Sequence, residues 1–137
     1  MDYGKADQSS VEKITVNLNV VEIGYIDILV SEGFYSNRSD FIKSAVRRQL
    51  DTHAADTKNA VEKKKPEFYV SVGVGGFTKA ELEKMAAQGR RANVVFIGLF
   101  SLPANITLEL LEKAVESIKV YGVCRCSQEI KERYSLK

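Results

Sequence analysis

The feature that most constrains this chain is a short alternating segment near its N-terminus. From Lys13 to Asn19, apolar side chains occupy the even positions and polar side chains occupy the odd positions. A period of two predicts a β-strand with one buried face and one solvent-exposed face. Such a strand cannot fold alone, because its backbone needs a second strand and its apolar face needs a cover.

Two amphipathic helices are predicted directly after this strand. Asn19 is a good helix N-cap residue, and Glu22 follows three residues later, as in a capping box. Gly33 suits the C-terminal end of the first helix. The run Ser36–Asp40 is rich in capping side chains and begins a second helix. The apolar stripe of that helix consists of Phe41, Ile42, Ala45, Val46 and Leu50.

A single chain supplies no partner for the strand over residues 13–19. The economical arrangement is a pair of chains whose strands align antiparallel over four helices, which makes the protein an obligate homodimer. The predicted dimer core consists of Ile14, Val16, Leu18, Phe41, Ile42 and Val46.

The outer face of such a ribbon presents Lys13, Thr15 and Asn17 twice, related by a two-fold axis. A two-stranded ribbon fits the major groove of B-DNA. Lysine can donate to guanine, asparagine can bind adenine through two hydrogen bonds, and threonine can contact the thymine methyl group. These three residues are therefore the candidate base-reading side chains, and double-stranded DNA is the candidate partner.

The start of the second helix is a candidate phosphate site. Free backbone N–H groups and the positive end of the helix dipole attract anions there. Ser36, Asn37 and Ser39 can add hydrogen bonds, and Arg38 can add charge. Contacts of this kind fix the position of a protein on DNA without reading its sequence.

Residues Lys13–Leu50 resemble the ribbon-helix-helix family of bacterial repressors and antitoxins, of the CopG, Arc and MetJ type. The resemblance rests on the Lys-Ile-Thr-Val-Asn-Leu strand, the break at Gly33 and the turn Tyr35–Ile42. It implies an intertwined dimer in which the outward strand residues read bases and the start of the second helix holds phosphate. The chain departs from many members at Asn19, where they carry proline or aspartate, although asparagine also caps a helix.

The C-terminal half has a different pattern, with three strand-helix units. The predicted strands are 68–74, 93–100 and 118–126, and the predicted helices are 78–88, 107–117 and 127–134. Gly98 and Gly122 lie 24 residues apart in two similar strands, and Gly73 lies 25 residues before Gly98. This spacing indicates a small strand-helix repeat with parallel strands.

The fold class is therefore α+β, with a ribbon-helix-helix dimer followed by a small α/β domain. We expect a flexible N-terminus (1–12), a DNA-binding domain (13–52), a linker or helix extension (53–66) and an α/β domain (67–137). The α/β domain is expected to serve oligomerisation, a protein partner or a ligand, and its parallel strands with open ends could stack subunits.

Composition excludes several classes of function. The net charge is +2, so charge alone does not indicate nucleic acid. Neither a membrane span nor a signal peptide is visible, which predicts a cytoplasmic, nucleoid-associated protein. Cys124 and Cys126 are expected to be reduced and packed in the core, and His53 is expected on the surface. We predict neither an enzyme nor a metal or other cofactor.

Three functional hypotheses remain open from the sequence. The favoured one is a sequence-specific transcription regulator that represses by occluding promoters. The second is an antitoxin or plasmid-partition protein with the same DNA-binding end. The third is a scaffold protein whose repeat half polymerises.

Overall fold

The computed structural model describes residues 10–137, which belong to two compact units. The N-terminal unit spans Lys13–Ala60, and the C-terminal unit contains Val61–Lys137. The expected flexible segment 1–12 falls mostly on residues 1–9, which lie outside the described residues. Within residues 10–137, no helix combines the length and the apolar content needed to cross a bilayer.

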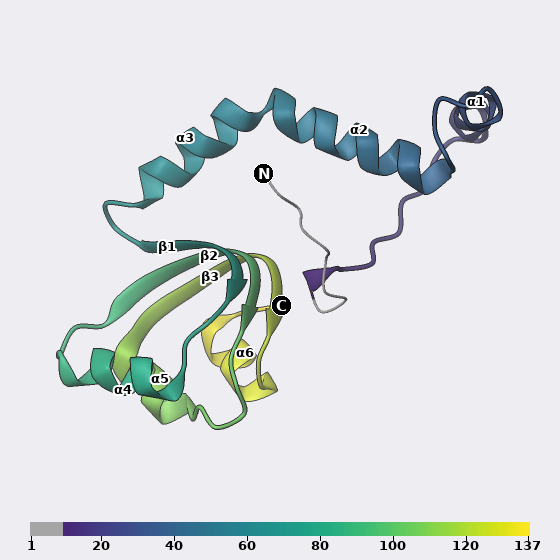
Figure 1. Cartoon of the computed structure of the whole chain (residues 1–137). Coiled ribbons are helices and arrows are strands. Elements are labelled where there is room, and N and C mark those ends of the chain that lie inside the picture. The colour runs from purple at the N-terminus through teal and green to yellow at the C-terminus, as the bar shows by residue number, and fades with distance from the viewer. Residues whose placement is uncertain (1–9) are drawn as a thin grey trace. The chain divides into compact units, whose positions relative to one another are not determined.

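The N-terminal unit contains helix α1 (Val20–Ser31) and helix α2 (Arg38–Thr52), shown in Figure 1. Asn19 caps α1, because its side-chain oxygen accepts a hydrogen bond of 2.7 Å from the Val21 N–H. Gly33 follows the end of α1 with a φ of 85°. The N–H of Phe34 donates to the carbonyl of Leu29, and this bond closes the turn that a glycine in this conformation permits.

Helix α3 (Ala54–Lys64) occupies most of the stretch predicted as a linker or helix extension. His53 separates it from α2, and the His53 ring Nδ1 lies 2.9 Å from a carboxylate oxygen of Asp56. The His53 side chain is exposed, as predicted.

The C-terminal unit is a parallel three-stranded sheet with helices between and after its strands (Figure 1). The strands lie in the order β1, β2, β3. Their bounds are β1 (Tyr69–Gly75), β2 (Ala92–Ser101) and β3 (Val115–Arg125), and the helices are α4 (Lys79–Ala87), α5 (Leu108–Ala114) and α6 (Gln128–Tyr134). This topology confirms the three predicted strand-helix units and their parallel strands.

One boundary differs clearly from the prediction. The sequence predicts a helix over 107–117, whereas α5 ends at Ala114 and β3 begins at Val115. Val115 is fully buried, pairs with Ala92 of β2, and is β-branched, which favours a strand. Tertiary packing therefore ends this helix one turn earlier than its local pattern suggests.

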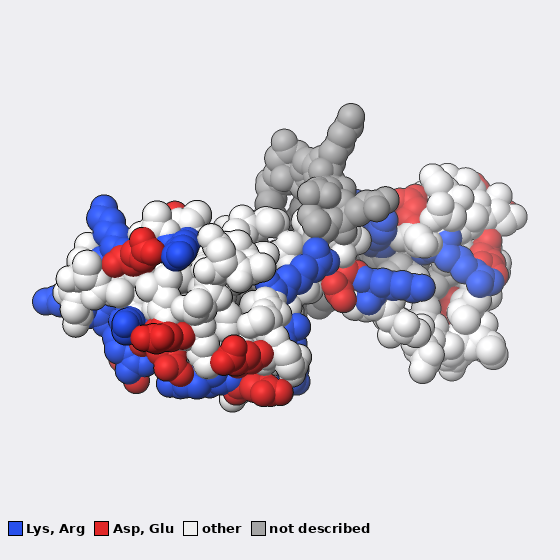
Figure 2. All heavy atoms as spheres, turned by 90° about the horizontal axis from the view of Figure 1, so that it is seen from below, with Lys and Arg blue, Asp and Glu red and all other residues white. Residues whose placement is uncertain are grey.

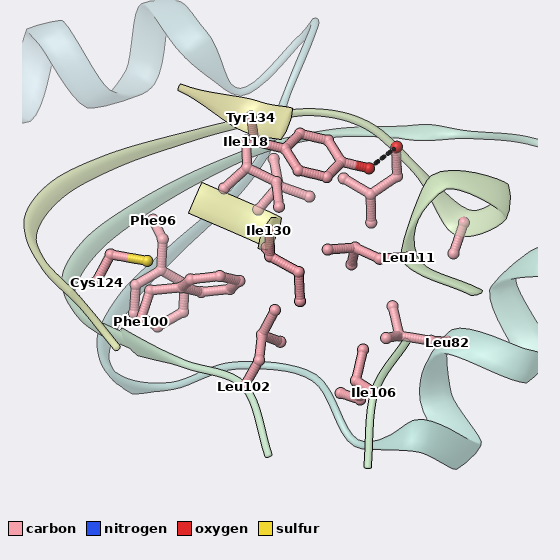
Figure 3. Close-up of a cluster of buried hydrophobic side chains, with 13 residues drawn as sticks. Leu82, Phe96, Phe100, Leu102, Ile106, Leu111, Ile118, Cys124, Ile130 and Tyr134 are labelled. Carbon is pink, nitrogen blue, oxygen red and sulfur yellow. Dashed lines mark hydrogen bonds between the residues drawn. The ribbon is translucent and has the colours of Figure 1, made fainter. Parts of the chain in front are cut away.

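The core of the C-terminal unit lies between one face of the sheet and its three helices. Figure 3 shows Leu82, Leu111 and Ile130, from α4, α5 and α6, pointing toward the sheet residues of this cluster. The Tyr134 hydroxyl donates a 2.7 Å hydrogen bond to the carbonyl of Val115, which satisfies both groups in the interior. Burial also raises the pKa of Tyr134 above its ordinary value.

A row of glycines crosses the sheet. Gly73, Gly98 and Gly122 pair with one another in register and have φ values of 123°, 127° and 128°. A Cβ atom on Gly98 would lie 2.1 Å from the carbonyl oxygen of Gly73, and one on Gly122 would lie 2.1 Å from that of Gly98. The backbone conformation therefore favours glycine at all three positions, and the close approach of the strands also requires it at Gly98 and Gly122.

The two cysteines lie near the end of β3. Cys124 is buried and Cys126 is partly buried, and their sulfur atoms are 3.2 Å apart as free thiols. Burial, together with the hydrogen bond between the thiols, raises the pKa of Cys124 to about 12. The Cys124 thiol is thus held protonated as part of the apolar core.

Candidate nucleic-acid interface

An open apolar groove of about 630 Å³ is the main feature of the N-terminal unit. The segment before α1, helix α1 and helix α2 all contribute side chains to it. Its lining consists of Val16, Leu18, Glu22, Tyr25, Ile26, Leu29, Phe41, Ile42, Ala45, Val46 and Gln49.

One chain leaves this groove largely uncovered. Ile26, at 6% exposure, is the one buried side chain among the described residues of the N-terminal unit. Val16 and Val46 are 57% and 50% exposed although both line the groove. Contiguous apolar surface on this scale marks a binding or assembly surface, because water contact with it is unfavourable.

The segment 13–19 forms no strand within a single chain. Val16 and Leu18 contribute to the groove, whereas Lys13, Thr15 and Asn17 are exposed and do not line it. From Thr15 to Leu18, the alternation of the sequence thus corresponds to positions outside and inside the groove lining. Five of the six predicted dimer-core residues line the groove, and the sixth, Ile14, lies outside its lining and is 76% exposed.

The start of α2 carries three of the four predicted phosphate-binding residues in its cap and first turn. Asn37 is the N-cap, and its side-chain oxygen accepts a 2.8 Å hydrogen bond from the Asp40 N–H. The Asp40 carboxylate in turn accepts a 2.9 Å bond from the Ser36 N–H. The hydroxyl groups of Ser36 and Ser39 make no hydrogen bond with any other described residue, and both residues are exposed.

Arg38 has a partner that sequence reasoning missed. Its guanidinium donates two hydrogen bonds of 2.8 Å to the Asp27 carboxylate, which joins the start of α2 to the middle of α1. The hydrogen bond from Arg38 lowers the pKa of Asp27, and the same pairing raises the pKa of Arg38. Arg38 therefore has a structural role within the chain, and no spacing rule links positions 27 and 38.

Glu22 and Tyr25 of α1 also line the groove, and sequence reasoning did not place them there. They lie beside Ile26 and Leu29, at the spacing of one helix face. Their spacing indicates a shared helix face, but tyrosine and glutamate are not residue types from which a buried core is predicted. Outside the groove, Tyr35 packs edge-on against Phe41, with ring centroids 5.0 Å apart, and fixes the turn before α2.

The charged side chains give no guide to the interface. In Figure 2, Lys and Arg side chains lie interspersed with Asp and Glu side chains over the C-terminal unit on the face shown. This mixture agrees with the small net charge of +2. The case for nucleic-acid binding therefore depends on the N-terminal architecture.

The N-terminal unit has the order of elements of a DNA-binding module, with an alternating segment followed by two helices that share an open apolar groove. Residues 9–131 match the model of the ribbon-helix-helix transcriptional regulator family. The match covers most of the chain, and the chain belongs to this family of DNA-binding transcriptional regulators. Comparison with curated proteins and with solved structures found no match.

Proposed function

We propose that this protein is a homodimeric, sequence-specific repressor that reads the DNA major groove with a β-ribbon built from two chains. The observation that carries the proposal is the division of the segment 13–19 into two faces. Val16 and Leu18 line the apolar groove, while Lys13, Thr15 and Asn17 are exposed.

A second copy of the N-terminal unit is the occupant that best fits the groove. Pairing two copies of residues 13–19 antiparallel supplies each strand with backbone partners and covers the apolar side chains of both chains. The half-exposed Val16 and Val46 become interior residues in such a dimer. A two-fold arrangement also closes on itself, which gives a discrete assembly.

In this dimer the six reading side chains, two each of Lys13, Thr15 and Asn17, lie on the outer face of the ribbon. Their hydrogen-bonding groups match those of base edges in the major groove. The two-fold axis predicts an operator with two inverted half-sites.

The start of α2 is proposed to hold DNA phosphate. Ser36 and Ser39 offer exposed hydroxyl groups beside the positive end of the helix dipole. Asn37 and Arg38 belong to the same proposed site, but the structure already engages both of them in hydrogen bonds within the chain. We therefore assign Asn37 and Arg38 mainly to shaping this turn, and Ser36 and Ser39 to direct contact.

The folded C-terminal unit favours a regulator over an antitoxin. Antitoxins with this DNA-binding end usually carry short tails that are disordered alone, whereas residues Val61–Lys137 contain a parallel sheet with its own core. Binding of the dimer over a promoter would exclude other proteins from it, which is the simplest route to repression.

The proposal is tested by comparing how DNA affinity changes when a proposed base-reading residue or a proposed phosphate-binding residue is substituted. Asn17→Ala is expected to weaken binding to the cognate operator by about 1–3 kcal/mol and to leave binding to random DNA almost unchanged. Operators can first be selected from a random DNA pool with the parent protein, and affinities can then be measured by fluorescence anisotropy.

Ser39→Ala is the matched control, because it removes a polar group from the same unit outside the ribbon. It is expected to weaken binding to cognate and random DNA equally. Equal losses on both DNAs for Asn17→Ala would refute its assignment as a reading residue. Failure of the parent protein to select any sequence would refute the proposed function.

A further inference from the structure

The edge strand β1 lacks the features that usually prevent sheet edges from pairing. From Phe68 to Thr78 the sequence contains no charged residue. Tyr69, Val72 and Val74 are 60%, 67% and 66% exposed. Within residues 10–137, β1 pairs with β2 alone, so its outer edge has no strand partner. An uncharged, β-branched edge of this kind is a template for another strand.

The opposite edge of the same sheet is protected. Strand β3 carries Glu116, Lys119 and Arg125, and all three are exposed. Charged side chains on an edge strand disfavour the approach of a further strand, because pairing would desolvate them. The sheet thus has an open edge at β1, which is uncharged, and a guarded edge at β3, which carries charged side chains.

A groove of about 420 Å³ lies along the open edge, on the helix side of β1. Side chains from β1, from α4 and from the start of β2 enclose it. Its lining consists of Tyr69, Ser71, Gly76, Phe77, Glu81, Lys84, Met85, Ala92 and Phe96. The open edge therefore offers both backbone hydrogen-bonding groups and an apolar recess beside them.

We propose that β1 and this groove form a self-association surface, on which the same surface of a second copy docks about a two-fold axis. The two β1 strands pair antiparallel and join two sheets into one of six strands. Glu81 and Lys84 lie about one turn apart on α4, so two antiparallel α4 helices place each Glu81 opposite the Lys84 of the other chain. The surface is thus complementary to itself in charge.

A head-to-tail arrangement fits this surface less well. It would bring the charged β3 edge of one chain against the uncharged β1 edge of the next, and it would leave one β1 edge unpaired at the end of the row. The two-fold arrangement buries the open edge of both chains and leaves both guarded edges outside. This inference is independent of DNA binding, since every residue in it belongs to the C-terminal unit.

Cysteine cross-linking in the full-length chain tests which edges meet. Val72→Cys and Val74→Cys are each oxidised with copper–phenanthroline and examined on a non-reducing denaturing gel. Tyr121→Cys is the matched control, because Val72, Ile97 and Tyr121 form one row across the sheet and Tyr121 is also exposed. The unsubstituted chain shows the background from Cys124 and Cys126.

We expect a covalent pair of chains from at least one of the two β1 variants, and only background from Tyr121→Cys. No covalent pair from either β1 variant would overturn the proposal. A mixture of Val72→Cys and Tyr121→Cys chains that cross-links between positions 72 and 121 would show head-to-tail stacking and would also overturn it.

Hydrogen exchange of the β1 amides gives a second, independent readout. Val72→Glu places a charge on the open edge, and Tyr121→Glu places the same charge in the same row of the guarded edge. We expect the β1 amides to exchange about tenfold faster in Val72→Glu than in the parent chain, and to be unchanged in Tyr121→Glu. Equal exchange in Val72→Glu and the parent, with unchanged circular dichroism, would contradict self-association at this edge.

Discussion

The two units of this chain bury apolar side chains to very different extents. In the C-terminal unit, thirteen buried residues form one cluster between the sheet and its helices. In the N-terminal unit, Ile26 alone is buried among the described residues, and the apolar faces of both helices open onto a groove. One unit therefore has its core within the chain, whereas the other leaves an open apolar groove that a second molecule covers in the proposed dimer.

In the proposed dimer, this difference couples folding to assembly in the N-terminal unit, whereas the C-terminal unit can fold without a partner. A unit with its own core folds without a partner, and association at its proposed β1 surface only adds to that stability. A unit whose core forms between chains gains its stability by association, and its stability rises with chain concentration. The following three experiments challenge this comparison, beginning with the largest expected effect.

Val16→Asp is expected to abolish the proposed dimer. The substitution places a carboxylate in the groove that the second chain must cover, and an unpaired charge in an apolar interface is strongly unfavourable. Light scattering should show a molar mass below that of the parent chain at the same concentration, and circular dichroism should show loss of helix. A Val16→Asp chain with the molar mass and helix content of the parent would mean that the groove is not a site of association.

Leu111→Ala should lower the free energy of unfolding of the C-terminal unit by about 2–5 kcal/mol, because it leaves a cavity at a fully buried position. The loss should be the same at chain concentrations that differ tenfold, as measured by urea unfolding. A loss that changes with chain concentration would indicate that this core, too, depends on association.

The smallest effect is expected from pH at the exposed Asp27–Arg38 pair. Pairing lowers the pKa of Asp27 below its ordinary value of 3.8. Its contribution to stability is therefore complete above that value and is lost as pH falls through the lower pKa of the folded chain. The difference in urea midpoint between the parent and Asp27→Asn should shrink between pH 6 and pH 3. A difference that is constant with pH would show that the pair adds nothing to stability.

The sequence was sufficient to predict structural features that a repeating pattern of residues encodes. The alternation in Lys13–Asn19 places Val16 and Leu18 in the groove lining and leaves Lys13, Thr15 and Asn17 outside it, because side chains of an extended segment alternate, while Ile14 also lies outside the lining. The glycine spacing in the C-terminal half predicted a strand repeat, and the structure aligns Gly98 with Gly122 across two strands.

The sequence was not sufficient where partners come from distant positions. The pairing of Arg38 with Asp27 depends on how α1 and α2 cross, which no local pattern encodes. The early end of α5 follows from the burial of Val115 against the sheet. The open edge at β1 appears only once the strand order is known, because its lack of charge also suits a central strand.

The glycine row has a consequence for how this protein can change in length. The carbonyls of Gly73 and Gly98 lie where a side chain at Gly98 or Gly122 of the next strand would stand, so the three positions are tied to one another. Deleting one residue inside a strand would move a larger side chain against a carbonyl oxygen and reverse the faces beyond it. Insertions and deletions in the C-terminal unit should therefore be tolerated only in the connecting loops, or as complete strand-helix repeats that each contain a glycine at the equivalent position.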